Sequence, residues 1–110
     1  MIECTIIRRT KLRSCSLNGH AGYSDNGDDI VCAAVSVLCA ALDASCMSHS
    51  SYNSSGTMGS GDFHAAYTGY SDAVNGRFDM FETGLRLIER QYPQCIHIKT
   101  IKREDEQEKI

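Results

Sequence analysis

Hydrophobic and polar residues alternate over two short segments at the start of the chain. The first runs from Ile2 to Arg8, where Ile6 and Ile7 interrupt the pattern, and the second runs from Leu12 to Leu17. Alternation with a period of two residues is typical of a β-strand with one buried face. The intervening residues 9–11 are polar or charged and predict a tight turn. We therefore expect the chain to begin with a β-hairpin.

A long apolar segment follows the acidic residues Asp28 and Asp29. It predicts a helix from Ile30 to Ser48, with Asp29 as its N-cap, because aspartate accepts hydrogen bonds from the first free N–H groups of a helix. Apolar side chains cover most of the helix circumference: Ile30, Val31, Ala34, Val35, Val37, Leu38, Ala41 and Leu42. Such a helix requires cover on more than one side, from a sheet and from a second helix or subunit.

The second half of the chain repeats this order of elements. In the Ser/Gly-rich residues 48–62, Tyr52 and Met58 fit a short strand of a hairpin that turns near Gly59-Ser60-Gly61. Residues 63–70 form a better strand. A helix is predicted from Ser71 to Tyr92, because apolar residues recur at helical spacing: Phe78, Phe81, Leu85 and Ile88.

Pro93 ends that helix, and the alternating residues from Cys95 to Ile101 predict a last strand. The order is strand-strand-helix-strand-strand-helix-strand. Hairpins interrupted by helices favour an α+β fold, a two-layer domain whose mostly antiparallel or mixed sheet packs against two main helices. We assign residues 1–101 to this single domain and residues 102–110 to a charged, solvated tail.

Composition narrows the classes of function. A chain of 110 residues is large enough for one core, and its net charge of −3 argues against direct binding of nucleic acid. No apolar run approaches the roughly 20 residues of a membrane span. The first residues lack the basic and apolar regions of a signal peptide. We expect a cytoplasmic protein that binds neither membrane nor nucleic acid and requires no cofactor.

The chain has six cysteines, which we expect to be reduced, because a disulfide framework requires a secretory context. Cys32, Cys39 and Cys46 recur every seventh residue on one helix face, about 10 Å apart and too far to bridge. Cys4 and Cys15 could face each other across the first hairpin. No pair has zinc-knuckle spacing, so we assign no metal ligand. Small core residues are the simplest interpretation of Cys39, Cys46 and Cys95.

His20 and Cys32 are the residues most suited to chemistry. A nucleophilic thiol needs a base and a field that favours the thiolate. The turn-forming residues 22–28 could bring the imidazole of His20 to the sulfur, and the first helical turn would stabilise an anion there. By spacing alone, a buried cysteine near a loop histidine is the commoner outcome. A metal site formed by His20, Cys32 and an aspartate is a further alternative.

The residues around this pair carry a more specific signal. Gly19-His20-Ala21, Gly27 and residues 29–36 (DIVCAAVS), with residues 21–31 between histidine and cysteine, resemble the signature of the bacterial ribosomal-processing cysteine protease family, Prp. The resemblance implies that Cys32 is the nucleophile and His20 its proton donor and base. It implies a substrate too, the N-terminal extension of large-subunit ribosomal protein twenty-seven, cut after an aromatic residue that needs an apolar pocket.

Several neighbours then become supporting or substrate-binding candidates: Gly19, Ala21, Gly27, Asp29 and Ser36. Asp29 is expected to act as a helix cap bonded to backbone N–H groups. Asp25 or Asp28 could orient His20, and the sequence does not choose between them. Ser36, one turn after Cys32, fits a polar wall of the pocket or a hydrogen bond to the preceding helical turn.

The sequence also bears on the oligomeric state and on an alternative function. The apolar circumference of the first helix favours a homodimer, as does the family resemblance. A non-enzymatic ribosome-assembly or peptide-binding module remains the alternative function, because it needs the groove without a reactive thiol. His49, His64 and His97 carry no partner signal and are interpreted as structural or surface residues.

Overall fold

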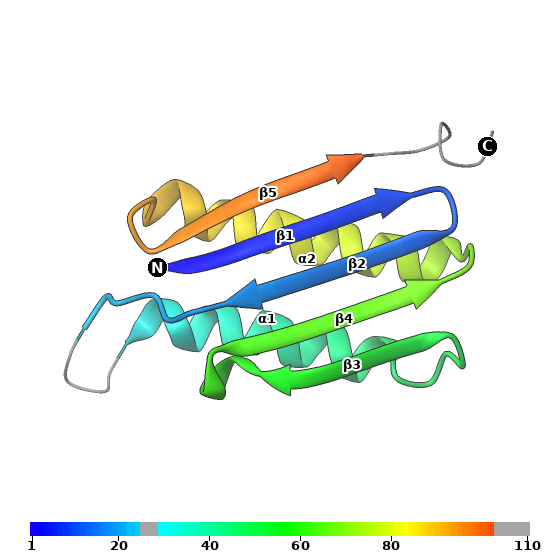
Figure 1. Ribbon diagram of the computed structural model, residues 1–110, viewed down its shortest axis with the longest axis horizontal. Helices are drawn as coiled ribbons and strands as arrows, with labels where there is room; N and C mark the ends of the chain where they lie inside the picture. Colours follow the sequence, from blue (N-terminus) through cyan, green and yellow to red (C-terminus); the bar gives the residue numbers. More distant parts are fainter. Residues whose placement is uncertain (25–28, 103–110) are drawn as a thin grey trace.

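The computed structural model describes residues 1–24 and 29–102 of the chain. One five-stranded sheet forms the first layer, and two helices form the second (Figure 1). The order along the chain is β1 (Ile2–Arg9), β2 (Leu12–Asn18), α1 (Ile30–Cys46), β3 (Tyr52–Thr57), the short 3₁₀ helix η1 (Met58–Ser60), β4 (Asp62–Thr68), α2 (Asp72–Gln91) and β5 (Ile96–Lys102). The predicted α+β fold and its element order are confirmed.

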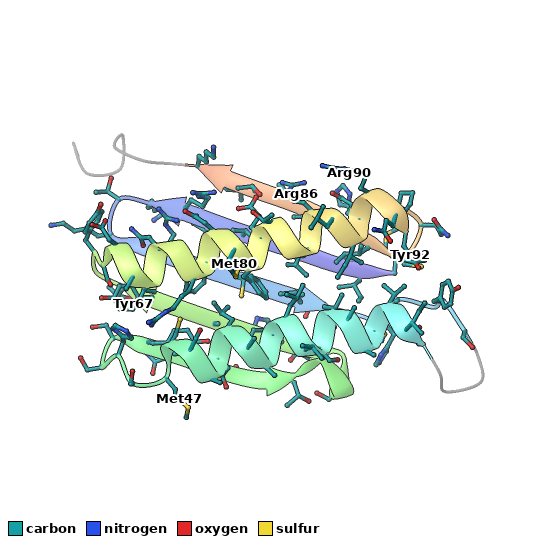
Figure 2. The ribbon with its side chains drawn as sticks, turned by 180° about the vertical axis from the view of Figure 1, so that it is seen from behind. Met47, Tyr67, Met80, Arg86, Arg90 and Tyr92 are labelled. Carbon is teal, nitrogen blue, oxygen red and sulfur yellow. The ribbon has the colours of Figure 1, made fainter. Side chains whose placement is uncertain are left out.

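The sheet is mixed, with the strand order β3-β4-β2-β1-β5. Strand β1 pairs antiparallel with β2 and parallel with β5, whereas β2–β4 and β3–β4 are antiparallel. Both helices cover the same face of the sheet, where they lie side by side (Figure 2). Within residues 1–24 and 29–102, the opposite face carries no helix, and β3 and β5 are the two edge strands.

The register of the first hairpin corrects one expectation. The β1–β2 turn holds only Thr10 and Lys11, which pairs Cys4 with Leu17 and Cys15 with Ile6. Since turn length sets the register of a hairpin, the two cysteines do not stand opposite each other. Both are buried and free. They contribute to the core as small apolar residues.

Each helix is capped by the residue that precedes it and buries one stripe. Asp29 caps α1 and Ser71 caps α2. The buried residues of α1 recur at helical spacing (Val31, Val35, Cys39, Leu42 and Cys46), as do those of α2 (Val74, Phe78, Phe81 and Leu85). They pack against inward-facing strand residues such as Ile2, Leu17 and Ile96 to form one core.

The ends of the elements differ slightly from the sequence interpretation. Helix α1 ends at Cys46 rather than Ser48, Met58 belongs to η1 rather than to β3, and β4 ends at Thr68. Strand β5 includes Lys102, the first residue of the predicted tail; residues 103–110 lie outside the described residues. Within the described residues, no helix is both long and apolar enough to cross a membrane.

Candidate active site

The N-terminal turn of α1 positions Cys32. Oδ1 of Asp29 accepts hydrogen bonds from the N–H groups of Val31 at 3.0 Å and Cys32 at 2.9 Å. Its Oδ2 accepts from the N–H of Tyr23 at 3.0 Å, which ties the preceding loop to the helix. Burial alone would raise the pKa of the Asp29 carboxyl, but these backbone donors and the Cys32 side chain together hold that pKa below its ordinary value. Asp29 is therefore a helix cap with its charge satisfied by N–H groups.

Cys32 is the one cysteine of the six that is not buried. The backbone N–H of Ala21 donates to its Sγ at 3.2 Å, which joins the end of the β2 loop to the helix. Burial raises the pKa of the Cys4 and Cys39 thiols to about 12 and raises that of Cys15 still further. Since the thiolate is the nucleophile, those buried cysteines are inert. Cys32 combines access with a hydrogen-bond donor directed at its sulfur.

His20 directly precedes Ala21, whose N–H contacts the Cys32 sulfur, but the His20 ring rests against Gly61 in the β3–β4 turn. A Cβ placed on Gly61 would come within 2.7 Å of His20 Nε2, so the imidazole packs directly on the glycine backbone. The N–H of Gly19 donates to the Gly61 carbonyl at 2.9 Å, and Gly61 has a positive φ of 77°. Across the described residues, no hydrogen bond joins His20 to Cys32.

The structure adds residues that the sequence analysis did not select. Gly61 forms one wall beside His20, and Tyr23 makes an edge-to-face contact with Tyr92 at a centroid distance of 5.5 Å. The two contacts join residues before α1 to the β3–β4 turn and to the end of α2. The Gly59-Ser60-Gly61 turn was visible in the sequence, but its position against His20 depends on tertiary structure. Gly27, Asp25 and Asp28 lie outside the described residues.

A groove of about 290 Å³ runs along α1 on the side that faces β3 and η1. Ser36 lies at the end of the groove nearer to Cys32, and Asp43 lies further along the helix. The groove is lined mainly by small and apolar residues: Ser36, Cys39, Ala40, Asp43, Gly56, Thr57, Met58, Gly59 and Phe63. Its size suits one or two side chains of a peptide.

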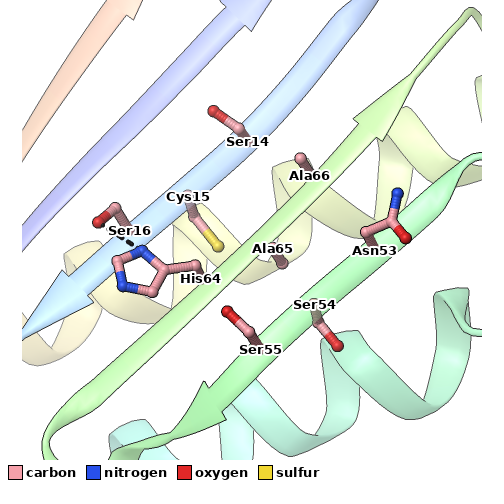
Figure 3. Close-up of a pocket in the computed structure, with 9 residues that line it drawn as sticks. All are labelled: Ser14, Cys15, Ser16, Asn53, Ser54, Ser55, His64, Ala65 and Ala66. Atoms are coloured by element: carbon pink, nitrogen blue, oxygen red, sulfur yellow. Dashed lines mark hydrogen bonds between the residues drawn. The ribbon is translucent and has the colours of Figure 1, made fainter.

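A second cavity, of about 430 Å³, lies on the face of the sheet without helices and is lined mostly by small residues (Figure 3). There Ser16 Oγ lies 2.9 Å from His64 Nδ1, and His64 Nε2 lies 2.7 Å from Asp62 Oδ1. Although this order resembles a hydrolytic triad, β2 and β4 each pair with strands on both sides. Their backbone N–H groups belong to the sheet and cannot form an oxyanion hole. His64 is a surface residue, as predicted.

No group of three His, Cys, Asp or Glu residues within residues 1–24 and 29–102 is arranged to hold a metal ion. His49 and His97 also lie away from the cysteine. His49 Nε2 is 3.0 Å from Arg77 Nη1, and His97 is exposed on β5. Among the described residues, the hydrogen bond to the Cys32 sulfur comes from the N–H of Ala21.

Comparison with known protein families identifies the family of the chain. The family model described as cysteine protease Prp matches residues 1–97. The chain belongs to the cysteine protease Prp family. It is accordingly a peptidase by family, and its two-layer fold is that of the Prp structures. No curated protein matches the chain.

Several solved structures have the same fold. SMU.848 from Streptococcus mutans is 28% identical, with a TM-score of 0.75, and the match covers 94% of this chain and 96% of that one. The essential ribosomal processing protease Prp from S. aureus, bound to a covalently linked product peptide, is 22% identical with a TM-score of 0.77, covering 91% and 99%. Its complex with a substrate peptide is 21% identical with a TM-score of 0.70 and the same coverage.

Proposed function

We propose that this protein is a cytoplasmic cysteine endopeptidase that removes the N-terminal extension of large-subunit ribosomal protein twenty-seven during ribosome maturation. The observation that carries the proposal is the accessible Cys32 in the first turn of α1, with the Ala21 N–H directed at its sulfur. Membership of the Prp family supports the reaction class. The S. aureus relative, named as a ribosomal processing protease, supports the substrate class.

In the proposed mechanism the thiolate of Cys32 attacks the carbonyl carbon of the scissile peptide bond. The Sγ–C bond forms, the C–N bond breaks, and the imidazolium of His20 gives its proton to the leaving amine. Neutral His20 then takes a proton from the water that attacks the thioester carbonyl. The C–Sγ bond breaks, which releases the acid product and regenerates the Cys32 thiolate and the His20 imidazolium. The N–H of Ala21, which contacts the sulfur in the free protein, lies where it can donate to the oxyanion.

This mechanism requires His20 to leave its position against Gly61. Proton transfer needs a heavy-atom distance of about 3 Å, or one bridging water, between the imidazole and the reacting group. His20 is exposed and its chain neighbours belong to a loop, so rotation of the ring toward Cys32 breaks no described hydrogen bond of that ring. We propose that the bound peptide favours this rotation.

The test is cleavage of a synthetic peptide that spans the extension junction. The native chain should cut it after the aromatic residue, whereas Cys32→Ala and Cys32→Ser should be folded and inactive. Circular dichroism checks that the variants fold. Iodoacetamide at mildly acidic pH should label Cys32 before the five buried cysteines. Full activity of Cys32→Ala would exclude the proposal, and peptide binding without cleavage by the native chain would favour the peptide-binding module.

We further propose that the protein acts as a homodimer through the outer surface of its helices. Several apolar side chains are exposed there: Ile30 by 53%, Val37 by 66%, Met80 by 74% and Leu87 by 49% (Met80 is labelled in Figure 2). A two-fold contact would remove them from water. Sedimentation equilibrium at micromolar concentration should give a dimer for the native chain and a 12.1 kDa monomer for Val37→Glu. A native monomer would exclude the assembly.

A further inference from the structure

The groove along α1 begins at Ser36, one helical turn after the proposed nucleophile Cys32, and reaches Asp43. Cys32, Ser36, Cys39 and Asp43 follow one another at intervals of three or four residues and share one side of the helix. At a rise of about 1.5 Å per residue, the helix advances roughly 16 Å from Cys32 to Asp43. An extended peptide covers that distance with about five residues. The reacting sulfur and Asp43 are thus separated by the length of a short peptide segment.

The wall opposite α1 suits the apolar part of such a segment. It is formed by the end of β3 and by η1, where Met58 is buried and Phe63 lies at the base of the groove. Gly59 contributes no side chain to fill the space. Strand β3 is an edge strand, so the backbone on its outer side has no partner strand. An extended peptide can add to such an edge while its side chains enter the groove.

Among the described residues that line the groove, Asp43 is the only charged one, and no basic side chain of those residues neutralises its carboxylate. The side chain is half-buried, and its Oδ1 accepts a hydrogen bond from the Ser54 hydroxyl. No lysine, arginine or histidine of the described residues forms an ion pair with it. Burial first, and the neighbouring Asp43 carboxylate after it, raise the pKa of the Tyr52 hydroxyl.

The helix adds to this negative field. Asp43 lies in the last turns of α1, where the free carbonyl groups carry the negative end of the helix dipole, and α1 has no basic residue in its last turn. A carboxylate in such a position attracts a cation. No basic side chain of the described residues pairs with Asp43.

We propose that Asp43 forms a subsite for a cationic side chain of the substrate peptide, a lysine or arginine about three to five residues from the scissile bond. The proposal rests on the proposed function, which supplies the path of the peptide. It assigns to the Asp43 end of the groove a preference for a positively charged side chain. Peptides with a neutral residue at that position bind through the apolar part alone. Peptides with an acidic residue there are repelled.

Binding measured without cleavage tests the subsite directly. In the inactive Cys32→Ala background, fluorescence anisotropy would follow labelled junction peptides that carry Lys, Gln or Glu at each of the third to fifth positions on either side of the cut. At one position, Lys should bind about two- to fivefold more tightly than Gln, the range for a partly exposed ion pair. Asp43→Asn should abolish this preference while keeping an oxygen for the Ser54 hydrogen bond.

Three controls separate charge recognition from structural damage. Asp72→Asn makes the same change of charge at the start of α2, beside Tyr70, and should keep the preference for Lys. Ser54→Ala removes the hydrogen bond but leaves the Asp43 charge, and should keep it too. A salt concentration of about 1 M should weaken the preference, because exposed ion pairs are screened.

The outcomes distinguish this inference from the proposed function. If the peptides bind and the native chain cuts them, but Lys, Gln and Glu bind equally at every position, the subsite is excluded and the protease remains. If no peptide binds, both are excluded. If charge discrimination is present in the binding assay but the native chain cuts nothing, the subsite stands and the endopeptidase does not. For the active enzyme, Asp43→Asn should change the Lys-to-Gln ratio of kcat/KM by the same factor as binding.

Discussion

The two helices lie side by side on one face of the sheet, yet their polar residues differ in number and in what they contact. Between Ile30 and Cys46, α1 has a single charged residue, Asp43. Helix α2 carries charges of both signs along its length, and they join it to the sheet. Asp79 pairs with Arg8 at 2.7 Å and with Arg13 at 3.1 Å, and Glu82 pairs with Arg8 at 3.2 Å.

This difference separates the part of the molecule that supports the fold from the part available for chemistry. Helix α2 is fixed by a buried apolar stripe and by ion pairs that its own sheet satisfies. Helix α1 leaves its N-terminal turn, its groove side and its outer surface without internal ionic partners. Substitutions around α1 should therefore alter cleavage more than stability, and substitutions in the α2 network should alter stability more than cleavage.

After loss of the nucleophile Cys32 itself, the largest expected effect on the α1 side is that of His20→Ala. Loss of the proton donor should lower kcat by about 10²- to 10⁴-fold, the usual contribution of general acid–base catalysis. The unfolding midpoint should remain near that of the native chain, because His20 is exposed. Steady-state cleavage of the junction peptide is the measurement. His97→Ala, which removes an exposed imidazole from β5, is the matched control, and an unchanged rate in His20→Ala would contradict the proposed dyad.

The corresponding change on the α2 side is Glu82→Gln. Glu82 accepts hydrogen bonds from Arg8 Nη1 at 3.2 Å and from Thr100 Oγ1 at 2.7 Å, and its side chain is only 14% exposed. Loss of its charge should lower the free energy of unfolding by about 2 kcal/mol. Urea denaturation measures this loss, and kcat/KM should stay constant under native conditions.

The exposed Glu3 on β1 is the control for that substitution, because Glu3→Gln should change stability by less than about 0.5 kcal/mol. If Glu82→Gln lowered kcat/KM tenfold in the folded enzyme, the division between the helices would be wrong. The network would then affect the site from the other helix.

Local sequence signals predicted both helices for reasons that the structure makes clear. The stripe of Phe78, Phe81 and Leu85 is buried as its spacing indicated, and Asp29 caps α1 as an aspartate before an apolar run should. A helix cap and the spacing of a buried stripe each depend on residues that are close together in the sequence, so both can be predicted from it. The same holds for the hairpins, whose turns fall close to the predicted positions.

Contacts between distant segments were not predictable in the same way. The position of Gly61 against His20 joins residues about forty positions apart in the sequence, and it depends on how the β3–β4 turn meets the end of β2. Cys4 and Cys15, which could have faced each other across the first hairpin, are offset by two residues, because Cys4 pairs with Leu17 in the observed register. The groove lined by Asp43 likewise exists only after α1 packs beside β3.

Two glycines, Gly61 in the β3–β4 turn and Gly76 in α2, test the same difference between the two regions with smaller expected effects. Gly61→Ala places a Cβ at a φ of 77° and within 2.7 Å of His20 Nε2. The positive φ costs about 1 kcal/mol of stability. Since the proposed mechanism requires the imidazole to leave Gly61, a methyl group that removes this resting position should raise kcat/KM. Gly76 lies in α2 with no atom within 4 Å of the added Cβ. Gly76→Ala should therefore raise stability by up to about 1 kcal/mol, because alanine favours a helix interior.

Urea denaturation and peptide cleavage of both variants provide the measurement. The comparison is supported if Gly61→Ala lowers stability while Gly76→Ala raises it, and if only Gly61→Ala changes kcat/KM. Equal activity of the two variants would show that the position of His20 does not depend on the β3–β4 turn.

The smallest expected difference compares the two helix caps. Asp29→Ala and Ser71→Ala each remove a side-chain acceptor from the first helical turn and should each cost about 1 kcal/mol at neutral pH. Their dependence on pH should differ. The folded protein holds the pKa of Asp29 below its ordinary value, so the carboxylate contributes its full stability above about pH 4 and loses it as the pH falls through the lowered pKa. The hydroxyl of Ser71 does not titrate in this range.

Urea denaturation of the native chain and both variants at pH 7, 5 and 3 would reveal the difference, where these pH values bracket the ordinary carboxyl pKa of about 4. The native chain should exceed Asp29→Ala by a constant margin at the two higher values and by a smaller one at the lowest. Its margin over Ser71→Ala should stay constant throughout. If both margins fell together with acid, the titrating group would lie elsewhere, and the backbone N–H groups at the start of α1 would not be what stabilises the Asp29 carboxylate.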